Sequence, residues 1–183
     1  SCRDLLPRVR STPDRPLHLL DIGCGEGRNA VHFARHGFIV TGIDLSRTGL
    51  EKTTLLAREI GVTVRVIEAD ISRWIPDRTY DVLFSSGTLH YLAPGIRPVK
   101  FREYHAATVL GGINAFSVLI EKPFIPPAPD AQPGVKLFRS GEIMSFYADW
   151  EILSMTEEIF DCHSGGIPHR HAVNRIIARR PAD

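Results

Sequence analysis

The sequence has almost no surplus of charge of either sign, because 22 lysine and arginine residues stand against 21 aspartate and glutamate residues. A chain with so little net charge lacks the long-range field that attracts nucleic acid or an anionic membrane, so we expect neither as a partner. It also lacks any apolar run near the roughly 20 residues that cross a bilayer, and residues 1–10 contain no long apolar core of a signal peptide. These absences predict a cytoplasmic protein whose partner is a small molecule.

Cysteine is also scarce, with three residues in a chain of 183. Cys2, Cys24 and Cys162 are far apart and form no C-x-x-C pair, which argues against a disulfide framework and against a thiolate zinc site. We therefore expect all three to be reduced thiols.

The length suits one domain, residues 1–183, in which residues 1–16 form a lead-in. Short apolar runs that predict strands alternate with amphipathic segments that predict helices. The strands are expected at 17–22, 38–43, 62–67, 80–84, 113–120, 150–160 and 172–178, and the helices at 28–36, 47–60, 97–110 and 140–148. This alternation predicts an α/β fold, a doubly wound, Rossmann-like and mostly parallel sheet with helices on both faces.

Five prolines fall within residues 122–134 (KPFIPPAPDAQPG), so this stretch cannot form regular structure. Loops of this length in compact domains often act as lids or binding loops. We expect residues 122–134 to be a stiffened loop and a candidate lid.

The stretch LDIGCGEGRN, residues 20–29, places three glycines between an expected strand and an expected helix. Such a turn lets a ligand lie against bare backbone, with the amides of the helix N-terminus pointing at it. The dinucleotide fingerprint G-x-G-x-x-G does not fit, because Gly27 comes one place early and Arg28 stands at the expected position. A nicotinamide-dependent reductase is disfavoured further, since the chain has no Y-x-x-x-K pair.

Polar side chains occur where the carboxyl ends of the expected strands meet. Asp21 precedes the glycine turn, Asp44 ends the second strand, Asp70 lies just beyond the third, and Ser85-Ser86 follow the fourth. These positions share the crevice in which open α/β sheets bind ligands. Three carboxylates repel a pyrophosphate but suit S-adenosylmethionine, which carries an ammonium group, ribose hydroxyls and an exocyclic amine. Asp81, at the start of a strand, is expected to be structural.

On these residues the sequence resembles the class I S-adenosylmethionine-dependent methyltransferases, whose first motif D/E-x-G-x-G-x-G is matched by residues 21–27. The runs GCGEGRNAVHFARHGFIVTGID, SSGTLHYL, VLGGINAF and LFRSGEIMSFYADWEIL are most similar to the tellurite-resistance methyltransferases. The resemblance implies a seven-stranded sheet with an antiparallel C-terminal hairpin strand. It also implies S-adenosylmethionine as the cofactor and S-adenosylhomocysteine as the product.

The resemblance assigns roles to the residues around the turn. Asp21 and the glycine backbone would hold the methionine part, Asp44 would bind the ribose hydroxyls, and Asp70 with Ile71 would face the adenine. The expected cofactor contacts are Asp21, Gly23, Cys24, Gly25, Gly27, Arg28, Asn29, Asp44, Leu45, Asp70, Ile71, Ser85 and His90.

The tellurite-resistance family carries substrate-facing histidine and arginine residues on its final hairpin, which here reads FDCHSGGIPHRHAVNRIIARR. A gap-free alignment puts Phe160 and Asp161 where the family has its histidine–arginine pair. The candidate catalytic residues in this hairpin are therefore His163, His169, Arg170 and His171. Because side chains alternate along a strand, either the histidines at 169 and 171 or the arginine at 170 faces the substrate.

Some of these residues have a second interpretation. The HRH stretch also fits a solvated segment before the last strand, and a metal site from Asp161 and the three histidines of the hairpin is chemically conceivable. The family resemblance gives the metal site no support, so no metal is expected. His90 can pack against the next helix instead of touching a ligand, and Arg28 with Asn29 can serve as plain first-turn helix residues.

The methyl acceptor is expected to be small. The fourth strand is followed by SSGT rather than by an N-P-P-Y sequence, and no Pro-Cys nucleophile is present, which disfavours DNA and RNA. The expected activity is methyl transfer to a soft nucleophile or an oxyanion such as tellurite, selenite or a thiol, with histidine as the natural base. The alternative is a sensor or structural protein that binds S-adenosylmethionine without turnover.

Overall fold

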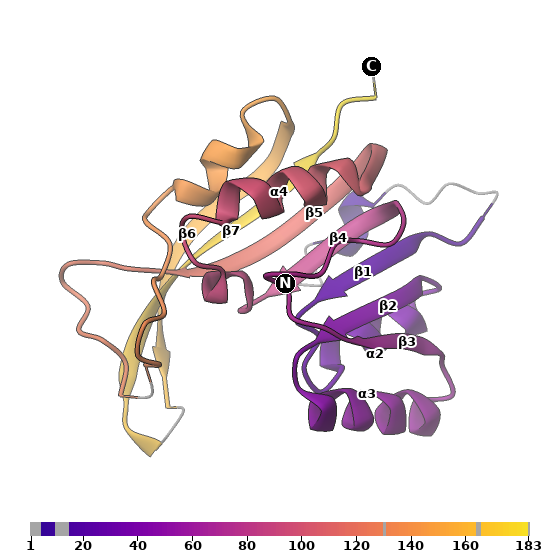
Figure 1. Cartoon of the computed structure of the whole chain (residues 1–183), viewed down its shortest axis with the longest axis horizontal. Helices are drawn as coiled ribbons and strands as arrows, with labels where there is room; N and C mark the ends of the chain where they lie inside the picture. Colours follow the sequence, from indigo (N-terminus) through magenta and orange to yellow (C-terminus); the bar gives the residue numbers. More distant parts are fainter. Residues whose placement is uncertain (1–4, 10–14, 130, 164–165, 183) are drawn as a thin grey trace.

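The computed structural model describes residues 5–9, 15–129, 131–163 and 166–182. Within this part of the chain, seven strands form one sheet with helices on both of its faces (Figure 1). The strands are β1 (His18–Ile22), β2 (Ile39–Asp44), β3 (Val64–Glu68), β4 (Tyr80–Ser86), β5 (Thr108–Ile120), β6 (Glu151–Cys162) and β7 (His169–Arg179). The α-helices are α2 (Arg28–Arg35), α3 (Arg47–Ile60) and α4 (Arg97–Ala106), and the 3₁₀ turns are η1 (Leu6–Arg8), η2 (Leu89–Tyr91) and η3 (Glu142–Tyr147).

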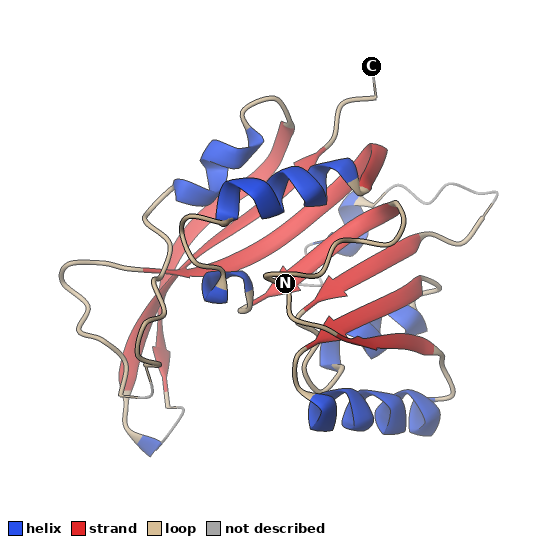
Figure 2. Cartoon of the chain, in the orientation of Figure 1, coloured by secondary structure: helices blue, strands red, loops and turns tan. Residues whose placement is uncertain are grey.

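The sheet has the order β3-β2-β1-β4-β5-β7-β6, and β7 runs opposite to both of its neighbours (Figure 2). The pairs from β3 to β5 are all parallel, so their carboxyl ends share one edge of the sheet. The start of β7 lies at the same edge, where Ala172 pairs with Ile120 at the end of β5. The expected mostly parallel, doubly wound sheet with an antiparallel C-terminal hairpin strand is confirmed.

Each face of the sheet has its own hydrophobic core, because successive strand residues point to opposite faces. On one face Leu19 and Val82 pack with Ala30 and Phe33 of α2 and with Leu50 of α3. The two helices therefore cover the half of the sheet that holds β1 and β2.

The second core lies on the opposite face, under α4 and η3. There Leu20 and Leu83 pack with Phe101 of α4 and Tyr147 of η3, and Phe101 stacks on Phe146 at a centroid distance of 4.2 Å. Offset aromatic contacts of this kind stabilise a core beyond the area that they bury.

The ends of α3 follow the sequence signals. Ser46 caps the start, because its hydroxyl oxygen accepts a hydrogen bond of 3.1 Å from the Gly49 amide. Gly61 ends the helix with a φ of 77°, a left-handed conformation that glycine adopts without strain.

The expected boundary between the helix at 97–110 and the strand at 113–120 is wrong. The helix α4 ends at Ala106, and β5 already begins at Thr108. Gly111, which was expected to end the helix, lies inside the strand with a φ of 74°, where the register between β4 and β5 shifts. A glycine in a strand marks a bulge as readily as it marks a helix end, so composition alone does not separate the two.

Three further boundaries differ from the expectation. Ser85 and Ser86 are the last residues of β4 rather than residues that follow it. The last strand begins at His169, so the HRH stretch lies inside β7 and not before it. The segment expected as a short helix at 140–148 is the 3₁₀ turn η3. The expectation that Cys2 is a reduced thiol lies outside the described residues.

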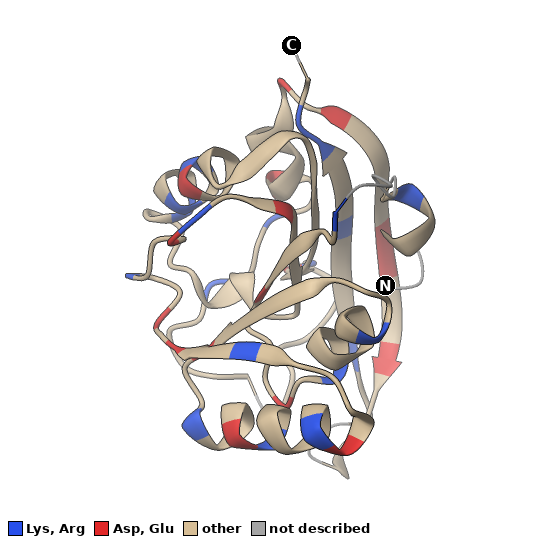
Figure 3. Ribbon diagram, turned by 90° about the vertical axis from the view of Figure 1, so that its right-hand side faces the viewer, with Lys and Arg blue, Asp and Glu red and all other residues tan. Residues whose placement is uncertain are grey.

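Basic and acidic residues are interspersed along the same elements (Figure 3). Asp81 is structural in the way expected, since its carboxylate accepts hydrogen bonds of 2.8 and 2.6 Å from the Arg15 guanidinium and one of 2.8 Å from the His18 amide. Among the described residues, no helix has the length and apolar character that crossing a membrane requires.

Candidate active site

The glycine turn after β1 is built from three left-handed glycines. Gly23, Gly25 and Gly27 have φ values of 75°, 55° and 83°. A Cβ on Gly23 would lie 2.1 Å from the Thr88 hydroxyl oxygen, and one on Gly27 would lie 2.6 Å from Thr53. A Cβ on Gly25 would meet no atom within 4 Å. Protein packing therefore requires the outer two glycines, while the middle one faces open space that a ligand can fill.

Hydrogen bonds tie this turn to the end of β2. The amides of Gly23 and Cys24 donate to the Ile43 carbonyl at 2.8 and 3.0 Å. The Gly25 amide donates to one carboxylate oxygen of Asp44 at 2.8 Å, and the other oxygen accepts from the Ser46 amide at 2.8 Å. Asp44 therefore holds the turn against the start of α3 while its remaining lone pairs stay at the sheet edge.

Asp21 is the most unusual polar group at this edge. It is 1% exposed, and neither of its carboxylate oxygens has a hydrogen-bond partner among the described residues. Burial raises the pKa of Asp21 to about 7, and the negative charge of Asp44 adds to the rise, while the nearby backbone amide of Ala30 opposes it. Buried polar groups in proteins nearly always have partners, so an unsatisfied carboxyl group next to an open glycine turn fits a cationic ligand.

Asp70 lies just beyond the end of β3, at the same edge of the sheet. Its carboxylate accepts a hydrogen bond of 2.8 Å from the Ser72 amide. Hydrogen bonds from the Ser72 side chain and backbone lower the pKa of Asp70, so this carboxyl group carries its charge. Two apolar residues lie next to the acidic ones: Leu45 is 69% exposed and Ile71 is partly buried. The edge thus combines charge with apolar surface.

Other expected cofactor residues have structural partners. The Ser85 hydroxyl donates to the Ile22 carbonyl at 2.8 Å and is buried, so it joins β4 to β1. Cys24 is buried, and burial raises the pKa of its thiol to about 12. Arg28 is exposed and Asn29 half-buried in the first turn of α2. The side chains of Ser85 and Cys24 are thus occupied within the protein.

A hollow of about 480 Å³ adjoins this edge on the side of β5 and β7. It lies between η2, the end of β5, the proline-rich segment and the start of β7. The lining residues with polar or charged side chains are His90, Tyr91, Glu121, Lys122, Gln132, Lys136, Arg170 and His171. The fold thus brings the proline-rich segment together with two of the four candidate catalytic residues.

His90 lies between the two parts of the site. It is 6% exposed, and its Nδ1 atom has no hydrogen-bond partner among the described residues. Burial lowers the pKa of His90 to about 4, and the positive charges of Arg97 and His171 lower it further. His90 is therefore a neutral imidazole near pH 7, and its ring also packs on Tyr91 at a centroid distance of 4.5 Å.

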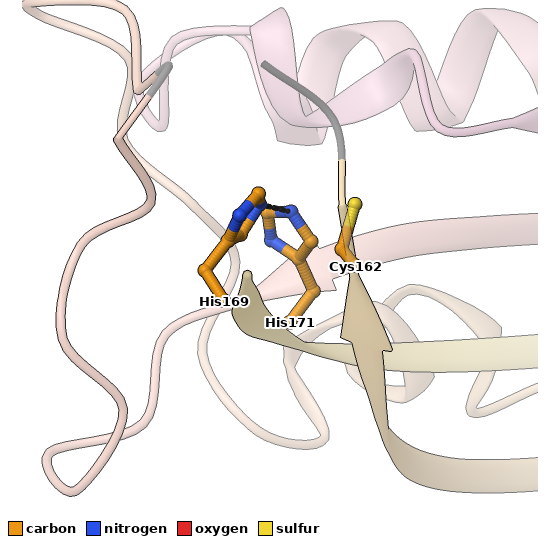
Figure 4. Close-up of side chains that lie close together, drawn as sticks. All are labelled: Cys162, His169 and His171. Carbon is orange, nitrogen blue, oxygen red and sulfur yellow. Dashed lines mark hydrogen bonds between the residues drawn. The ribbon is translucent and has the colours of Figure 1, made fainter. Parts of the chain in front are cut away.

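The candidate residues of the final hairpin lie on two faces. His169 and His171 contact each other, with 2.9 Å between their Nε2 atoms, as the alternation along the strand predicted (Figure 4). Arg170, on the other face of β7, pairs in register with Asp161 of β6. His163, Asp161 and His169 line a second hollow of about 490 Å³.

Sequence reasoning missed two features of this region. Cys162 lies opposite His169 in the hairpin and close to both His169 and His171. This could not be predicted, because it depends on the register between β6 and β7. Arg97 is 1% exposed and holds the stretch that follows the proline-rich segment. Its guanidinium donates to Glu142 at 2.8 Å and to the Lys136 carbonyl, and it lies 3.8 Å from the centre of the Phe138 ring. A buried arginine gives no signal in a single sequence.

Comparison with known proteins assigns the family. Residues 19–112, about half of the chain, match the methyltransferase domain family, and the match includes the glycine turn and the three carboxylates. The chain belongs to the class I S-adenosylmethionine-dependent methyltransferases. The cofactor of this class is S-adenosylmethionine, which the unsatisfied Asp21 carboxyl group and the open face of Gly25 fit.

The methyltransferase is similar to two curated proteins over most of its length. The probable S-adenosyl-L-methionine-dependent methyltransferase TehB of Haemophilus influenzae (strain 10810) is 24% identical over 149 residues, which cover 81% of this chain and 51% of TehB. A protein named Hemagglutinin 1 of Eikenella corrodens is 26% identical over 169 residues, which cover 91% of this chain and 55% of that protein. The chain thus spans about half the length of the curated relatives that it matches.

The fold is also that of a solved structure. The crystal structure of TehB from Haemophilus influenzae matches with a TM-score of 0.85 at 22% identity, and the match covers 98% of this chain and 61% of that chain.

Proposed function

We propose that this methyltransferase transfers the methyl group of S-adenosylmethionine to a small, soft or oxyanionic acceptor such as a thiol, tellurite or selenite. The observation that carries the cofactor part is Asp21, a buried carboxyl group without a hydrogen bond among the described residues, beside a glycine turn with an open middle position. The hollow next to it supports the acceptor part.

In this proposal the sheet edge binds the cofactor in three places. Asp21 takes the ammonium group, and the backbone of the glycine turn lies against the methionine part. The lone pairs of Asp44 that remain beside its two amide bonds accept from the ribose hydroxyls. Leu45 and Ile71 provide apolar contacts for the adenine, and Asp70 lies next to them. The other expected contacts, Arg28, Asn29 and His90, border the same edge.

For methyl transfer, the protein mainly has to position the acceptor relative to the methyl group. A sulfonium is a good, neutral leaving group, and displacement from it needs an in-line acceptor and exclusion of water. Residues 122–134 lie over the hollow and act as its lid in this proposal. Arg170 and the hairpin histidines, including His163, are the groups that orient an oxyanion or take a proton from a thiol. Burial lowers the pKa of His90 to about 4, so His90 is a weak base and suits hydrogen bonding to a ligand rather than proton abstraction.

The remaining parts of the proposal concern the whole chain. We propose that residues 1–183 form one domain that works in the cytoplasm, without nucleic acid as a partner. The nearly balanced charge of the chain supports the last point.

The test is calorimetric titration with S-adenosylhomocysteine, followed by methyl transfer to tellurite, selenite and simple thiols in the same preparation. We expect Asp21→Asn to weaken binding about 10- to 100-fold, because it removes a charged hydrogen bond and leaves the shape unchanged. Asp44→Ala is expected to weaken binding by about one to a few kcal/mol. The exposed carboxylate variant Asp149→Asn is the control and should bind as the wild type does.

The outcomes separate the two parts of the proposal. Unchanged affinity in Asp21→Asn would contradict the cofactor site. Binding without turnover on any acceptor would favour a sensor over an enzyme and would leave the cofactor site standing.

A further inference from the structure

Three side chains with metal-binding atoms gather at the end of the final hairpin. Cys162 of β6 and His169 and His171 of β7 lie close together; the two histidine rings face each other, and Cys162 lies beside them on the neighbouring strand (Figure 4). The Cys162 sulfur and one ring nitrogen of each histidine all lie within 4.8 Å of one another. All three residues are half-buried, so solvent ions reach them.

The backbone brings these side chains together. Cys162 and His169 are directly opposite each other in the antiparallel pair, so their side chains emerge on the same face. His171 follows two residues later and shares that face. Asp161 and Arg170 alternate with them and are paired with each other, so they point to the opposite face. The fold thus selects a sulfur and two imidazoles and excludes the adjacent carboxylate.

A backbone carbonyl orients one of the histidines. His169 Nδ1 lies 2.7 Å from the Ile167 carbonyl oxygen, which can only accept a hydrogen bond, so Nδ1 carries the proton. The Nε2 atom of the neutral ring then has a lone pair, and it is this atom that faces His171 at 2.9 Å. Histidines that bind metals are commonly held by such a carbonyl on the other ring nitrogen.

The hairpin end needs additional stabilisation. Ala172 is the first residue of β7 that pairs with β5, so residues 169–171 pair with β6 alone. A two-stranded ribbon is marginally stable in water by itself. A metal ion bound by Cys162 and both histidines would link β6 to β7 at the end of the hairpin.

We propose that Cys162, His169 and His171 form a binding site for a divalent cation of the zinc type. Thiolate and imidazole are the ligands that zinc prefers, at about 2.3 Å for sulfur and about 2.0 Å for nitrogen. Tetrahedral geometry at these lengths separates two nitrogens by about 3.3 Å and nitrogen from sulfur by about 3.5 Å. The distance of 2.9 Å between the two nitrogens has to increase slightly. The distance from the Cys162 sulfur to the nitrogens, which is within 4.8 Å, has to shorten, and rotation of the Cys162 side chain achieves this.

The site has three protein ligands, which leaves one position for water or another small donor. Sites with an open position are typical of reactive zinc, whereas purely structural zinc has four protein ligands. His171 also lines the hollow beside the glycine turn, and His169 lines the second hollow. The ion therefore lies next to the place that we assign to the acceptor, although its binding does not depend on that assignment.

The test uses Co²⁺ as a spectroscopic probe in place of Zn²⁺, on the full chain after treatment with a chelator. We expect one equivalent of Co²⁺ to give the near-ultraviolet charge-transfer band of a cobalt–thiolate bond together with the visible bands of tetrahedral cobalt. Zn²⁺ should displace the cobalt and abolish both. Cys162→Ser should lose the charge-transfer band, and His169→Gln and His171→Gln should each weaken Co²⁺ binding at least tenfold.

His36→Gln is the matched control, because His36 is an exposed histidine at the C-cap of α2. It should bind Co²⁺ as the wild type does. Thermal unfolding gives a second measurement: Zn²⁺ should raise the Tm of the wild type and of His36→Gln but not that of Cys162→Ser. A charge-transfer band that persists in Cys162→Ser, the absence of any cobalt–thiolate band in the wild type, or equal zinc stabilisation of all variants would each overturn the proposal. None of these measurements needs methyl transfer, so failure of the enzyme assignment would leave them interpretable.

Discussion

At the scale of single residues, Asp21 has the environment that departs furthest from that of an ordinary surface carboxylate. It combines nearly complete burial, the absence of a hydrogen bond among the described residues and a pKa raised to about 7. Perturbed carboxyl groups of this kind are concentrated at functional sites, because the perturbation persists only where function retains it. The free protein therefore holds Asp21 partly protonated at neutral pH.

This predicts a pH dependence of cofactor binding. The ammonium group of the cofactor needs the charged form of Asp21, so affinity for S-adenosylhomocysteine should fall about tenfold for each pH unit below about 7 and should level off above it. Calorimetric titration on both sides of neutral pH measures the effect. Asp21→Asn should bind weakly and with little dependence on pH. A wild-type affinity that stays constant from mildly acidic to mildly alkaline pH would argue against the pairing.

The same pKa acts on folding with a defined sign. The pKa of Asp21 is higher in the folded state than its usual value of 3.8, so between about 4 and 7 the folded state holds a proton that the unfolded chain has lost. This residue therefore lowers the free energy of unfolding as the pH rises through that window. In the proposed site, the cofactor ammonium group would offset this cost above pH 7.

The position of a residue in the sequence was enough to predict which carboxylates lie at the sheet edge. It was not enough to predict the hydrogen-bond partners of the residues at that edge. Asp21, Asp44 and Asp70 were placed correctly because the ends of parallel strands share an edge. Ser85 followed the same rule, yet its hydroxyl bonds to the Ile22 carbonyl, which depends on its exact neighbour across the sheet. A single sequence does not contain that information.

At the scale of elements, the glycines of the turn after β1 differ in their roles: one is required by packing inside the protein, and another faces open space. Gly27 is in a left-handed conformation and a Cβ there collides with Thr53, whereas Gly25 has free space around it. The two positions therefore give different results on substitution.

We predict that Gly27→Ala lowers stability and that Gly25→Ala lowers cofactor affinity. The left-handed conformation costs an alanine about 1–2 kcal/mol, and at Gly27 the contact of 2.6 Å with Thr53 adds to this cost. At Gly25 the added methyl group occupies the space that a ligand needs. Urea unfolding and titration with S-adenosylhomocysteine measure the two effects. If Gly25→Ala bound the ligand normally and was the less stable of the two, the separation would be refuted.

The proline-rich segment is held at its return to the sheet by Arg97. This guanidinium is buried and bonds to Glu142, to the Lys136 carbonyl and to the Leu92 carbonyl. At its other end Lys122 pairs with Glu157, and hydrogen bonds from Lys122, Ser140 and Asn174 lower the pKa of Glu157 to about 2. Between these two anchors, Ile125 packs against the hydrophobic core under α4 and η3.

We predict that Arg97→Met destabilises the protein by about 3–5 kcal/mol, because removal of one partner from a buried ion pair leaves polar groups unpaired. Arg47→Met is the control, since Arg47 forms an exposed pair with Glu51 and its loss should cost less than about 1 kcal/mol. Urea unfolding followed by circular dichroism compares the two. If both substitutions lowered the free energy of unfolding equally, the burial of Arg97 would make no additional contribution to stability.

The elements themselves were predictable where a periodic pattern was bounded by a cap. The helix α3 was found with both ends because Ser46 and Gly61 mark them. The border between α4 and β5 was missed because Gly111 supports a bulge and a helix end equally well, and the contacts of β5 with β4 decide between them. The contacts of Arg97 with Lys136, Phe138 and Glu142 were not visible in the sequence, since these residues come together only in the fold.

At the scale of the whole molecule, the two halves of the sheet carry different parts of the proposed site. The half with β1 to β3 carries the glycine turn and the carboxylates, and the half with β5 to β7 carries the hollow and the hairpin residues. Strand β4 lies between them, and both hydrophobic cores continue across it through Val82 and Leu83. The halves are therefore expected to unfold together.

We predict a single cooperative unfolding transition. Trp74 follows β3 and Trp150 precedes β6, and both pack against the same core, so tryptophan fluorescence reports from both halves. Its midpoint in urea should coincide with that of the far-ultraviolet circular dichroism. Saturating S-adenosylhomocysteine should move both midpoints upward together. Two resolved transitions would mean that the halves are independent domains.

The reversed direction of β7 has a consequence for how such a protein changes over generations. Between β6 residues 160–162 and β7 residues 169–171 the hairpin extends past the rest of the sheet, where the two strands pair only with each other. Lengthening, shortening or rewriting that extension leaves every parallel strand and the glycine turn untouched. If the hairpin faces the acceptor as proposed, selection for a new acceptor can change the hairpin tip at little risk to folding and leave the proposed cofactor site unaltered.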